Sequence, residues 1–233
     1  MSLYRYGAIL ATGLGLSLIL CKPAAAQLIA LTNLPTGTPT TGVQLGTNTG
    51  AAGSQAWMGV ELTNNGPIAS LVDVKATFTN NSALPNDNPV VNRVVTGGVY
   101  SSVGGSPGVL LSAFNQQTIL AGQTDITKTF VPLAPFSLQT GVDYWFVFTA
   151  DVVTAESALT WRRAVANPAP VPAPNFATTG YKLSTDNKAT WGASAQNSSI
   201  QIRVAVAPEP ASLPLFGVGL SLITMAILRR RLV

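Results

Sequence analysis

Short apolar segments separated by turn residues recur through the middle of the chain, and no helical period of useful length appears between residues 27 and 207. The segment LVDVKATFT alternates cleanly between apolar and polar positions. Its apolar face consists of Val72, Val74, Ala76 and Phe78. Such alternation predicts a half-buried strand.

Many short strands with polar turns predict an all-β fold, an antiparallel β-sandwich or jelly roll.

Two further segments refine this expectation. Residues 144–148, YWFVF, are apolar at every position, which predicts a central strand covered on both faces. Residues 104–108, GGSPG, fit the G-x-S-x-G pattern of a hydrolase nucleophile. The chain has no histidine to act as a base, and Pro107 has no N–H to offer an oxyanion hole. We therefore interpret this segment as a tight turn between two strands.

The net charge of +4 does not indicate a nucleic-acid-binding protein. Only 9% of the residues are charged, and residues 27–207 hold eight acidic and eight basic residues, so the middle is neutral. The excess comes from Arg5, Lys22 and residues 229–231, less Glu209. A DNA-binding domain gathers basic residues on one folded face. We expect no nucleic-acid partner.

Residues 1–26 have the three parts of a secretory signal peptide. Arg5 gives a positive start, residues 7–21 are uncharged and apolar, and Ala24 and Ala26 are the small residues that a signal peptidase requires. We expect cleavage after Ala26. The alternative, a retained membrane helix, fits less well because Lys22, Pro23 and three alanines follow the apolar run directly.

The C-terminal tail has the pattern of a membrane span. Residues 211–228 carry no charge, and Arg229, Arg230 and Arg231 follow at once. Eighteen helical residues span about 27 Å, close to the hydrocarbon core of a bilayer. The arginines are typical of a cytoplasmic stop. The sequence therefore predicts a single transmembrane helix that leaves the domain outside, rather than a buried core helix.

Residues 208–233 also resemble a known sorting signal. Pro208, Glu209 and Pro210 are followed by Ala-Ser-Leu, a glycine-spotted apolar run and the arginine cluster. This order is similar to that of a PEP-CTERM sorting signal. The resemblance implies a chain exported by a Gram-negative-type bacterium, held in the inner membrane by its C-terminal helix and cut near Pro-Glu-Pro by an exosortase. The product would go to the cell surface or the exopolysaccharide matrix.

The middle of the chain resembles a second family. The segments GGSPGVLL, LQTGVDYW and KATW, within residues 55–204, are similar to those of a choice-of-anchor R domain. That resemblance implies a surface domain found with various anchoring tails. It implies no catalytic residue.

The expected organisation has four parts. They are a signal peptide at 1–26, a Thr/Gly-rich lead-in at 27–54, the β-sandwich domain at 55–206 and the sorting tail at 207–233. Residues 165–176 contain four prolines in alternate positions. We expect a stiff, extended surface loop there, without a strand.

Few residues suit catalysis or metal binding. Histidine is absent, and cleavage after Ala26 would also remove the only cysteine, Cys21, so the usual zinc, copper and iron ligands would be missing from the mature protein. We expect no cofactor and no enzyme. A carboxylate pair could still serve a glycosidase. The candidates are Asp125, Asp143, Asp151 and Glu156, which we expect to be solvated. The loops at 86–88 and 186–187 leave calcium binding open.

Trp161, beside two arginines, and Trp191, in the turn KATWGAS, are the tryptophans that we expect at the surface, where they could contact sugars. The sequence thus predicts an exported structural or adhesive protein. Its expected partners are an exosortase, the inner membrane and exopolysaccharide. The alternative is a carbohydrate- or calcium-binding surface module.

Overall fold

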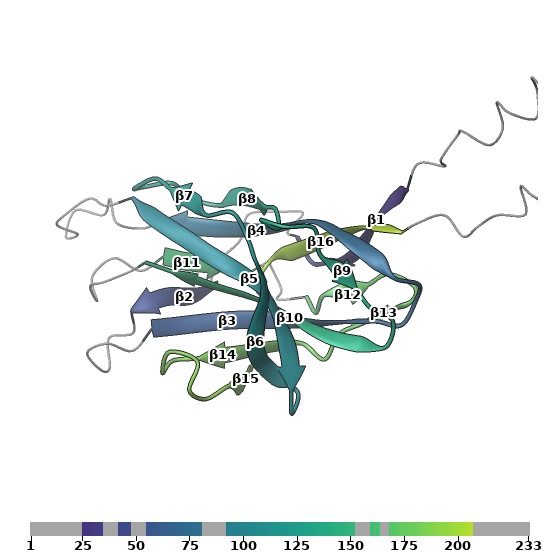
Figure 1. Cartoon of the computed structure of the whole chain (residues 1–233). Coiled ribbons are helices and arrows are strands. Elements are labelled where there is room, and N and C mark those ends of the chain that lie inside the picture. Colours follow the sequence, from purple (N-terminus) through teal and green to yellow (C-terminus); the bar gives the residue numbers. More distant parts are fainter. Residues whose placement is uncertain are drawn as a thin grey trace, which may run out of the picture. The chain divides into compact units, whose positions relative to one another are not determined.

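The computed structural model describes residues 25–34, 42–47, 55–80, 92–151, 159–163 and 168–206. Throughout these residues the chain forms β-strands, turns and loops (Figure 1), and every pair of strands with a described register is antiparallel. The all-β class is therefore confirmed. Within these ranges no helix is long and apolar enough to cross a bilayer. The tail at 207–233 and the predicted signal peptide up to residue 24 lie outside the described residues.

One layer is built around β3 and β10. Its strands are β3 (Gln55–Asn64), β5 (Arg93–Val103), β6 (Ser106–Ala113), β7 (Gln117–Ile119), β10 (Val142–Ala150), β13 (Phe176–Ala177), β14 (Tyr181–Ser184) and β15 (Gly192–Ser194). β10 lies between β3 and β5, and β6 lies on the far side of β5. Tyr144 to Ala150 of β10 are all buried, which confirms the prediction of a central strand for residues 144–148.

The other layer is built around β4. Its strands are β1 (Ala26–Thr32), β4 (Ala69–Asn80), β8 (Ile126–Phe130), β9 (Ser137–Leu138), β11 (Leu159–Arg162), β12 (Val171–Pro172) and β16 (Ile200–Val206). β16 and β11 pair with β4, and β1 lies beside β16. β2 (Gly42–Thr47) pairs with β11 and with β3, so it links the two layers.

The core is aromatic and lies between the layers. Phe148 of β10 contacts Phe130 of β8, with 4.8 Å between ring centroids, and Trp161 of β11 at 5.1 Å. Phe78 of β4 lies against the same three rings. All four side chains are fully buried. Large aromatic side chains supply much apolar area and preferred edge-to-face contacts, so this cluster holds the layers together.

The alternation predicted for β4 is correct at three of its four positions. Val74, Ala76 and Phe78 are buried in the core. The register with β16 shifts between Arg203 and Val204, so that Arg203 pairs with Asp73 but Val204 pairs with Leu71. A bulge of this kind reverses the side that later residues face. Val72 has no partner residue on β16 and is partly exposed, and Leu71 is buried where the alternation predicted Val72 to be.

The expected boundary at residue 55 is wrong. The compact unit spans Gln27–Val206, because β1 and β2 belong to the sheet and bury Ala30, Leu31 and Leu45. The apolar runs in this range are short and flanked by Thr and Gly, which conceals them in the sequence. The expectation of a strandless proline loop is also wrong at one point. Residues 171–172 form β12 at the edge beside β1, where proline is tolerated because no ladder N–H is lost.

The turn predicted at residues 104–108 is confirmed. Gly104 and Gly105 connect β5 to β6, and Val103 pairs with Ser106 across them. Both glycines have positive φ, 56° and 70°. A two-residue hairpin loop with positive φ at both positions matches the right-handed twist of its strands and favours glycine or asparagine.

We predict that Gly105→Val lowers the free energy of unfolding by about 1–2 kcal/mol, because a β-branched residue is strained at this φ. Gly105→Asn, which tolerates positive φ, is the matched control and should stay near the wild-type value. Urea unfolding followed by tryptophan fluorescence checks both. Equal stability of the two variants would contradict the assigned turn.

Candidate functional site

The outer face of the β3–β10 layer carries a cluster of aromatic and basic side chains. Trp145 of β10 pairs with Tyr100 of β5. The next residue, Phe146, points into the core, so Trp145 points to the outer face of the layer. Tyr100, Trp145 and Val147 form a separate buried cluster against which Trp57 and Trp191 pack. We call Trp57, Tyr100, Trp145, Lys182, Lys188 and Trp191 the aromatic–lysine face.

Both lysines lie against aromatic rings. Lys188 Nζ is 4.3 Å from the centroid of the Trp57 ring and 5.7 Å from that of Tyr100. Lys182 Nζ is 5.7 Å from the centroid of Trp145 and donates a hydrogen bond of 2.8 Å to Ser106 Oγ. Cation–π contacts of this kind stabilise a lysine near an aromatic surface while its charge stays accessible. The face therefore presents positive charge beside apolar rings.

The rings differ in accessibility. Trp145 is 1% exposed and Tyr100 is 6% exposed, so both serve as the floor of the face. Burial raises the pKa of the Tyr100 hydroxyl. Trp57 and Trp191 are only partly buried. A ligand would therefore meet Trp57, Trp191 and the two lysines.

The loop at 185–191 positions Lys188 and Trp191. Asp186 Oδ1 accepts hydrogen bonds from Ser184 Oγ (2.8 Å) and from the backbone N–H of Thr190 (2.9 Å), and its Oδ2 accepts one from Thr190 Oγ1. Asn187 and Lys188 have positive φ. Trp57 Nε1 donates to Asn187 Oδ1 at 3.2 Å. The loop is thus held in one compact conformation against β3.

These hydrogen bonds also set the acidity of the loop. The side-chain hydrogen bond from Thr190, followed by the bonds from the Thr190 N–H and from Ser184, lowers the pKa of Asp186 from its ordinary 3.8 to about 2. The carboxylate is therefore charged at every physiological pH and stabilises the loop as an acceptor.

A buried carboxylate lies near this face. Glu61 of β3 is 3% exposed and pairs across the sheet with Trp145. Thr179 Oγ1 donates to Glu61 Oε2, and Ser102 Oγ lies 3.5 Å from Oε1. Ser102 in turn accepts a hydrogen bond of 3.2 Å from Trp145 Nε1. This chain of polar contacts fixes the indole of Trp145 under the face.

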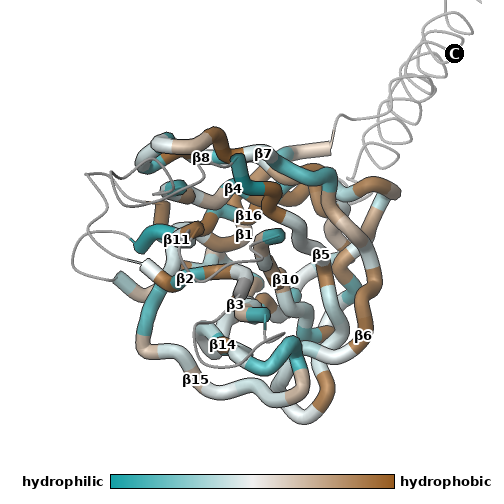
Figure 2. The backbone as a smooth tube through the Cα atoms, turned by 90° about the vertical axis from the view of Figure 1, so that its left-hand side faces the viewer, coloured by the Kyte–Doolittle hydropathy of each residue, from teal (hydrophilic) through white to brown (hydrophobic). Residues whose placement is uncertain are grey.

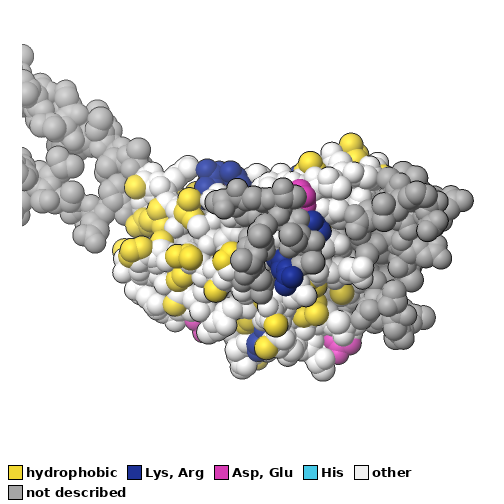
Figure 3. Space-filling model, turned by 180° about the vertical axis from the view of Figure 1, so that it is seen from behind, with side chains coloured by type: hydrophobic (Ala, Val, Ile, Leu, Met, Phe, Trp, Pro, Cys, Tyr) yellow, Lys and Arg dark blue, Asp and Glu magenta, His cyan; other side chains and the backbone are white. Residues whose placement is uncertain are grey.

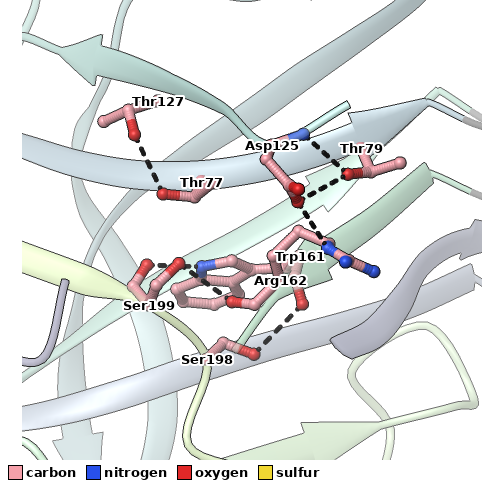
Figure 4. Close-up of polar contacts among 8 residues, drawn as sticks. All are labelled: Thr77, Thr79, Asp125, Thr127, Trp161, Arg162, Ser198 and Ser199. Carbon is pink, nitrogen blue, oxygen red and sulfur yellow. Dashed lines mark hydrogen bonds and ion pairs between the residues drawn. The ribbon is translucent and has the colours of Figure 1, made fainter. Parts of the chain in front are cut away.

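The expectation of an exposed Trp161 is wrong. Trp161 is fully buried, and its Nε1 donates a hydrogen bond of 2.9 Å to the Ser199 carbonyl (Figure 4). Strand alternation places Trp161 on the inner side of β11, whereas Arg162 Nε binds Asp125 Oδ1 at 2.8 Å. The arginines that follow Trp161 do not indicate that it is exposed, because successive residues of a strand face opposite sides of the sheet. Trp191 remains a candidate ligand contact, within the aromatic–lysine face.

The other candidate acids are engaged in separate local contacts. Asp125 binds Arg162 and Thr79 (Figure 4). Asp143 accepts a hydrogen bond from Thr63 Oγ1 at 2.6 Å, and Asp151 accepts one from the Val94 N–H at 2.8 Å. Glu156 lies outside the described residues. Each described carboxylate has an evident structural role.

Of the two loops considered for calcium binding, the structure describes only the one at 186–187. Residues 86–88 lie outside the described part of the chain. The side-chain oxygens of Asp186 and Asn187 accept the internal hydrogen bonds described above. Within the described ranges, no group of three or more Asp, Glu, His or Cys side chains is placed to hold a metal ion.

Trp57, Glu61 and Lys188 were not predicted from the sequence. Trp57 and Glu61 share one face of the segment AWMGVEL, and this alternation is the signal that could have found them. Lys188 comes from a loop more than a hundred residues away. No protein-family model matches this chain, and comparison with curated proteins finds no significant relative.

We predict that the loop at 185–191 opens in acid. A carboxyl whose pKa is lowered by folding contributes stability above its unfolded pKa, here 3.8, and loses it as the pH falls through about 2. The ¹³C shift of the Asp186 carboxyl should titrate near 2, and Trp57 and Trp191 fluorescence should change over the same range. Asp143→Asn, the matched control, should retain this change and Asp186→Asn should lose it. Titration of Asp186 near 3.8 would contradict the hydrogen-bonded loop.

Proposed function

We propose that this chain is an exported, non-enzymatic cell-surface or matrix protein with one β-sandwich domain. In this proposal, residues 1–26 are a signal peptide, and an exosortase recognises the tail at 207–233 while its helix at 211–228 lies in the inner membrane. The observation that carries the proposal is the extent of the compact unit, Gln27–Val206. The unit begins after the predicted cleavage point and ends two residues before Pro208. Apart from Ala26, the first residue of β1, the fold therefore uses none of the residues assigned to the signal peptide or to the tail.

The arrangement of the first and last strands supports this division. β1 and β16 are neighbours, and the Asn33 N–H after β1 donates to the carbonyl of Ile200, which begins β16. β1 therefore begins, and β16 ends, at the same end of the domain (Figure 1). Processing at both termini would leave every strand of the unit from Gln27 onward intact.

The same end of the domain has apolar side chains on its surface. Viewed from behind, hydrophobic side chains gather toward the end that carries β1 and β12 (Figure 3). Ile29 of β1 and Val171 of β12 are 43% and 66% exposed. Ile68, which directly precedes β4 beside Val206, is 53% exposed. Exposed apolar side chains of this kind suit a surface held against an envelope layer.

We predict that replacing Pro208, Glu209 and Pro210 by alanine keeps the protein in the membrane fraction with its tail intact, because the exosortase loses its recognition motif. Immunoblotting of membrane, surface and medium fractions from the native host measures this. Ser70→Ala, an exposed change in β4, is the control and should leave the distribution unchanged. Normal release of the triple variant would contradict a sorting role for these residues.

The aromatic–lysine face favours a second candidate function, binding of an acidic polysaccharide. Partly exposed indoles offer apolar surfaces on which sugar rings stack, and ammonium groups attract uronate carboxylates. Trp57 and Trp191 provide the stacking surfaces, and Lys182 and Lys188 provide the ammonium groups. This role is compatible with an adhesive protein of the matrix.

We predict that Trp191→Ala weakens binding to polygalacturonate at least about tenfold, which corresponds to a loss of about 1.4 kcal/mol. Leu120→Ala, a change at a side chain 49% exposed elsewhere, is the control. Isothermal titration calorimetry at low and high salt measures both the loss of affinity and the part of the binding free energy that depends on salt. Neutral dextran should not compete. No saturable binding of the wild type to polygalacturonate would end this candidate.

A further inference from the structure

β16 leaves the domain beside the turn that precedes β4. Val206, the last residue of β16, pairs with Ala69, the first residue of β4, and Ile68 directly precedes Ala69. β1 lies beside β16 and begins at this same end (Figure 1). The end of the domain from which the tail continues is therefore formed by the start of β1 and the turn at 65–68.

Two other turns complete this end. The Asn65 N–H donates to the carbonyl of Asn175 at 2.8 Å, and Thr140 Oγ1 donates to the carbonyl of Gly66 at 2.7 Å. The turn after β12 and the turn before β10 are thus hydrogen-bonded to the turn before β4. We call the apolar residues on these elements the exit face, and they are Ile29, Pro67, Ile68, Val142 and Pro174.

The side chains of the exit face are exposed. Ile68 is 53% exposed, Ile29 43% and Val142 39%, and both prolines are exposed as well. The three large side chains come from three separate elements that meet at one end of the domain. Large apolar side chains that gather on one exposed surface are a mark of an interaction site.

The chain segments that form the exit face carry no charge. The sequence has no charged residue at 23–60, 62–72, 129–142 or 164–181. Asp143 directly follows Val142, and its carboxylate accepts a hydrogen bond of 2.6 Å from Thr63 Oγ1. The opposite end differs. Figure 2 looks at that end and shows hydrophilic stretches near β7, β8 and β11, where Asp125 and Arg162 form an ion pair. The domain is therefore apolar and neutral at the end that continues into the tail.

The length of the connection to the tail limits what can lie against this face. Four residues, 207–210, separate Val206 from the apolar run at 211–228. An extended chain spans at most about 3.6 Å per residue, so the five steps from Val206 to residue 211 reach at most about 18 Å. The headgroup region of one leaflet takes up about 5–7 Å of that reach. With the run in the hydrocarbon core, the exit face is held at or just above the headgroups.

We propose that the exit face binds the external leaflet of the bilayer that holds the tail, and that Ile29, Ile68 and Val142 insert among the lipid headgroups. This inference rests on the proposed membrane span and names the surface that the domain uses there. The covalent tether makes the contact intramolecular, so a few apolar side chains suffice for it. The face needs no anionic lipid, because attraction to anionic headgroups is provided by basic residues. Cleavage near Pro-Glu-Pro would remove the tether and so release the domain.

Fluorescent labels on the tail-bearing protein in phosphatidylcholine nanodiscs test the proposal. In a Cys21→Ser background, Ile68→Cys, Val142→Cys and Leu120→Cys each receive the environment-sensitive dye NBD. Emission at 68 and 142 should be blue-shifted and quenched by a spin label on the lipid headgroup. Leu120 is 49% exposed and follows β7 at the opposite end of the domain, so its label should show neither effect. Equal quenching at the three positions would overturn the proposal.

A fourth label separates failure of this inference from failure of the proposed span. Leu220→Cys lies within the apolar run and reports the span through a spin label on the acyl chains. Quenching at 220 with none at 68 and 142 would refute the inference and leave the sorting proposal standing. No quenching at 220 would refute both. Blue-shifted emission at 68 and 142 that the lipid does not quench would mean that protein, such as a second copy, covers the face instead.

A longer tether distinguishes insertion from proximity alone. About ten Gly/Ser residues inserted after Ala207 add a flexible reach of about 17 Å. Quenching at 142 should persist in this chain, because the exit face itself binds lipid. Ile29→Asn together with Ile68→Asn should abolish the quenching, whereas Leu120→Asn, the matched control, should not. Circular dichroism shows whether each variant is folded. Loss of quenching on lengthening alone would contradict a contact made by the exit face.

Discussion

The burial of Trp161 between the two layers is the contact on which the rest of the structure depends. Its ring lies edge-on to Phe148, at 5.1 Å, and to Tyr181, at 6.1 Å, so it joins β11 to β10 and β14. Its Nε1 is bound by the Ser199 carbonyl, directly before β16. A buried indole with a satisfied N–H combines a large apolar contact with a directional bond.

Hydrogen bonds around Trp161 connect it to the first and last strands of the domain. The Tyr181 hydroxyl, whose pKa is raised by burial, donates to the Ser198 carbonyl, and Asn33 Oδ1 accepts a hydrogen bond of 2.8 Å from the Ile200 N–H. These bonds fix the end of β1 and the start of β16 together. They also anchor β14, from which the loop carrying Lys188 and Trp191 extends. The chain termini of the domain and the aromatic–lysine face therefore share one support.

Much of the fold could be predicted from local patterns, and the misses have physical reasons. The central strand β10, three of the four inward positions of β4 and the glycine turn follow from apolar periodicity and positive-φ chemistry within a few residues. Val72 was misplaced because a bulge depends on the partner strand β16. The exposure expected for Trp161 is wrong because the two arginines beside it in the sequence say nothing of the side of the strand on which Trp161 lies. β1 and β2 were missed because their apolar runs are short and pair with distant strands.

The aromatic–lysine face was less predictable, since it is assembled from β3, β5, β10 and a loop after β14. Of its residues, the sequence predicts only Trp191 as an exposed ligand contact. The tail at 207–233 is the reverse case, because the sorting role proposed for it rests on the linear order of residues 208–231 and not on a fold. The two kinds of information are complementary: the structure defines the domain, and the sequence outside it proposes where the domain goes.

The mass of the native protein, isolated from the cell surface or matrix, tests this account most directly. We expect a product that begins at Gln27 and lacks the apolar run at 211–228 and the arginines after it. Intact mass spectrometry resolves both ends in one measurement. Recovery of the full 24.1 kDa chain from the surface, with both terminal segments attached, would contradict it.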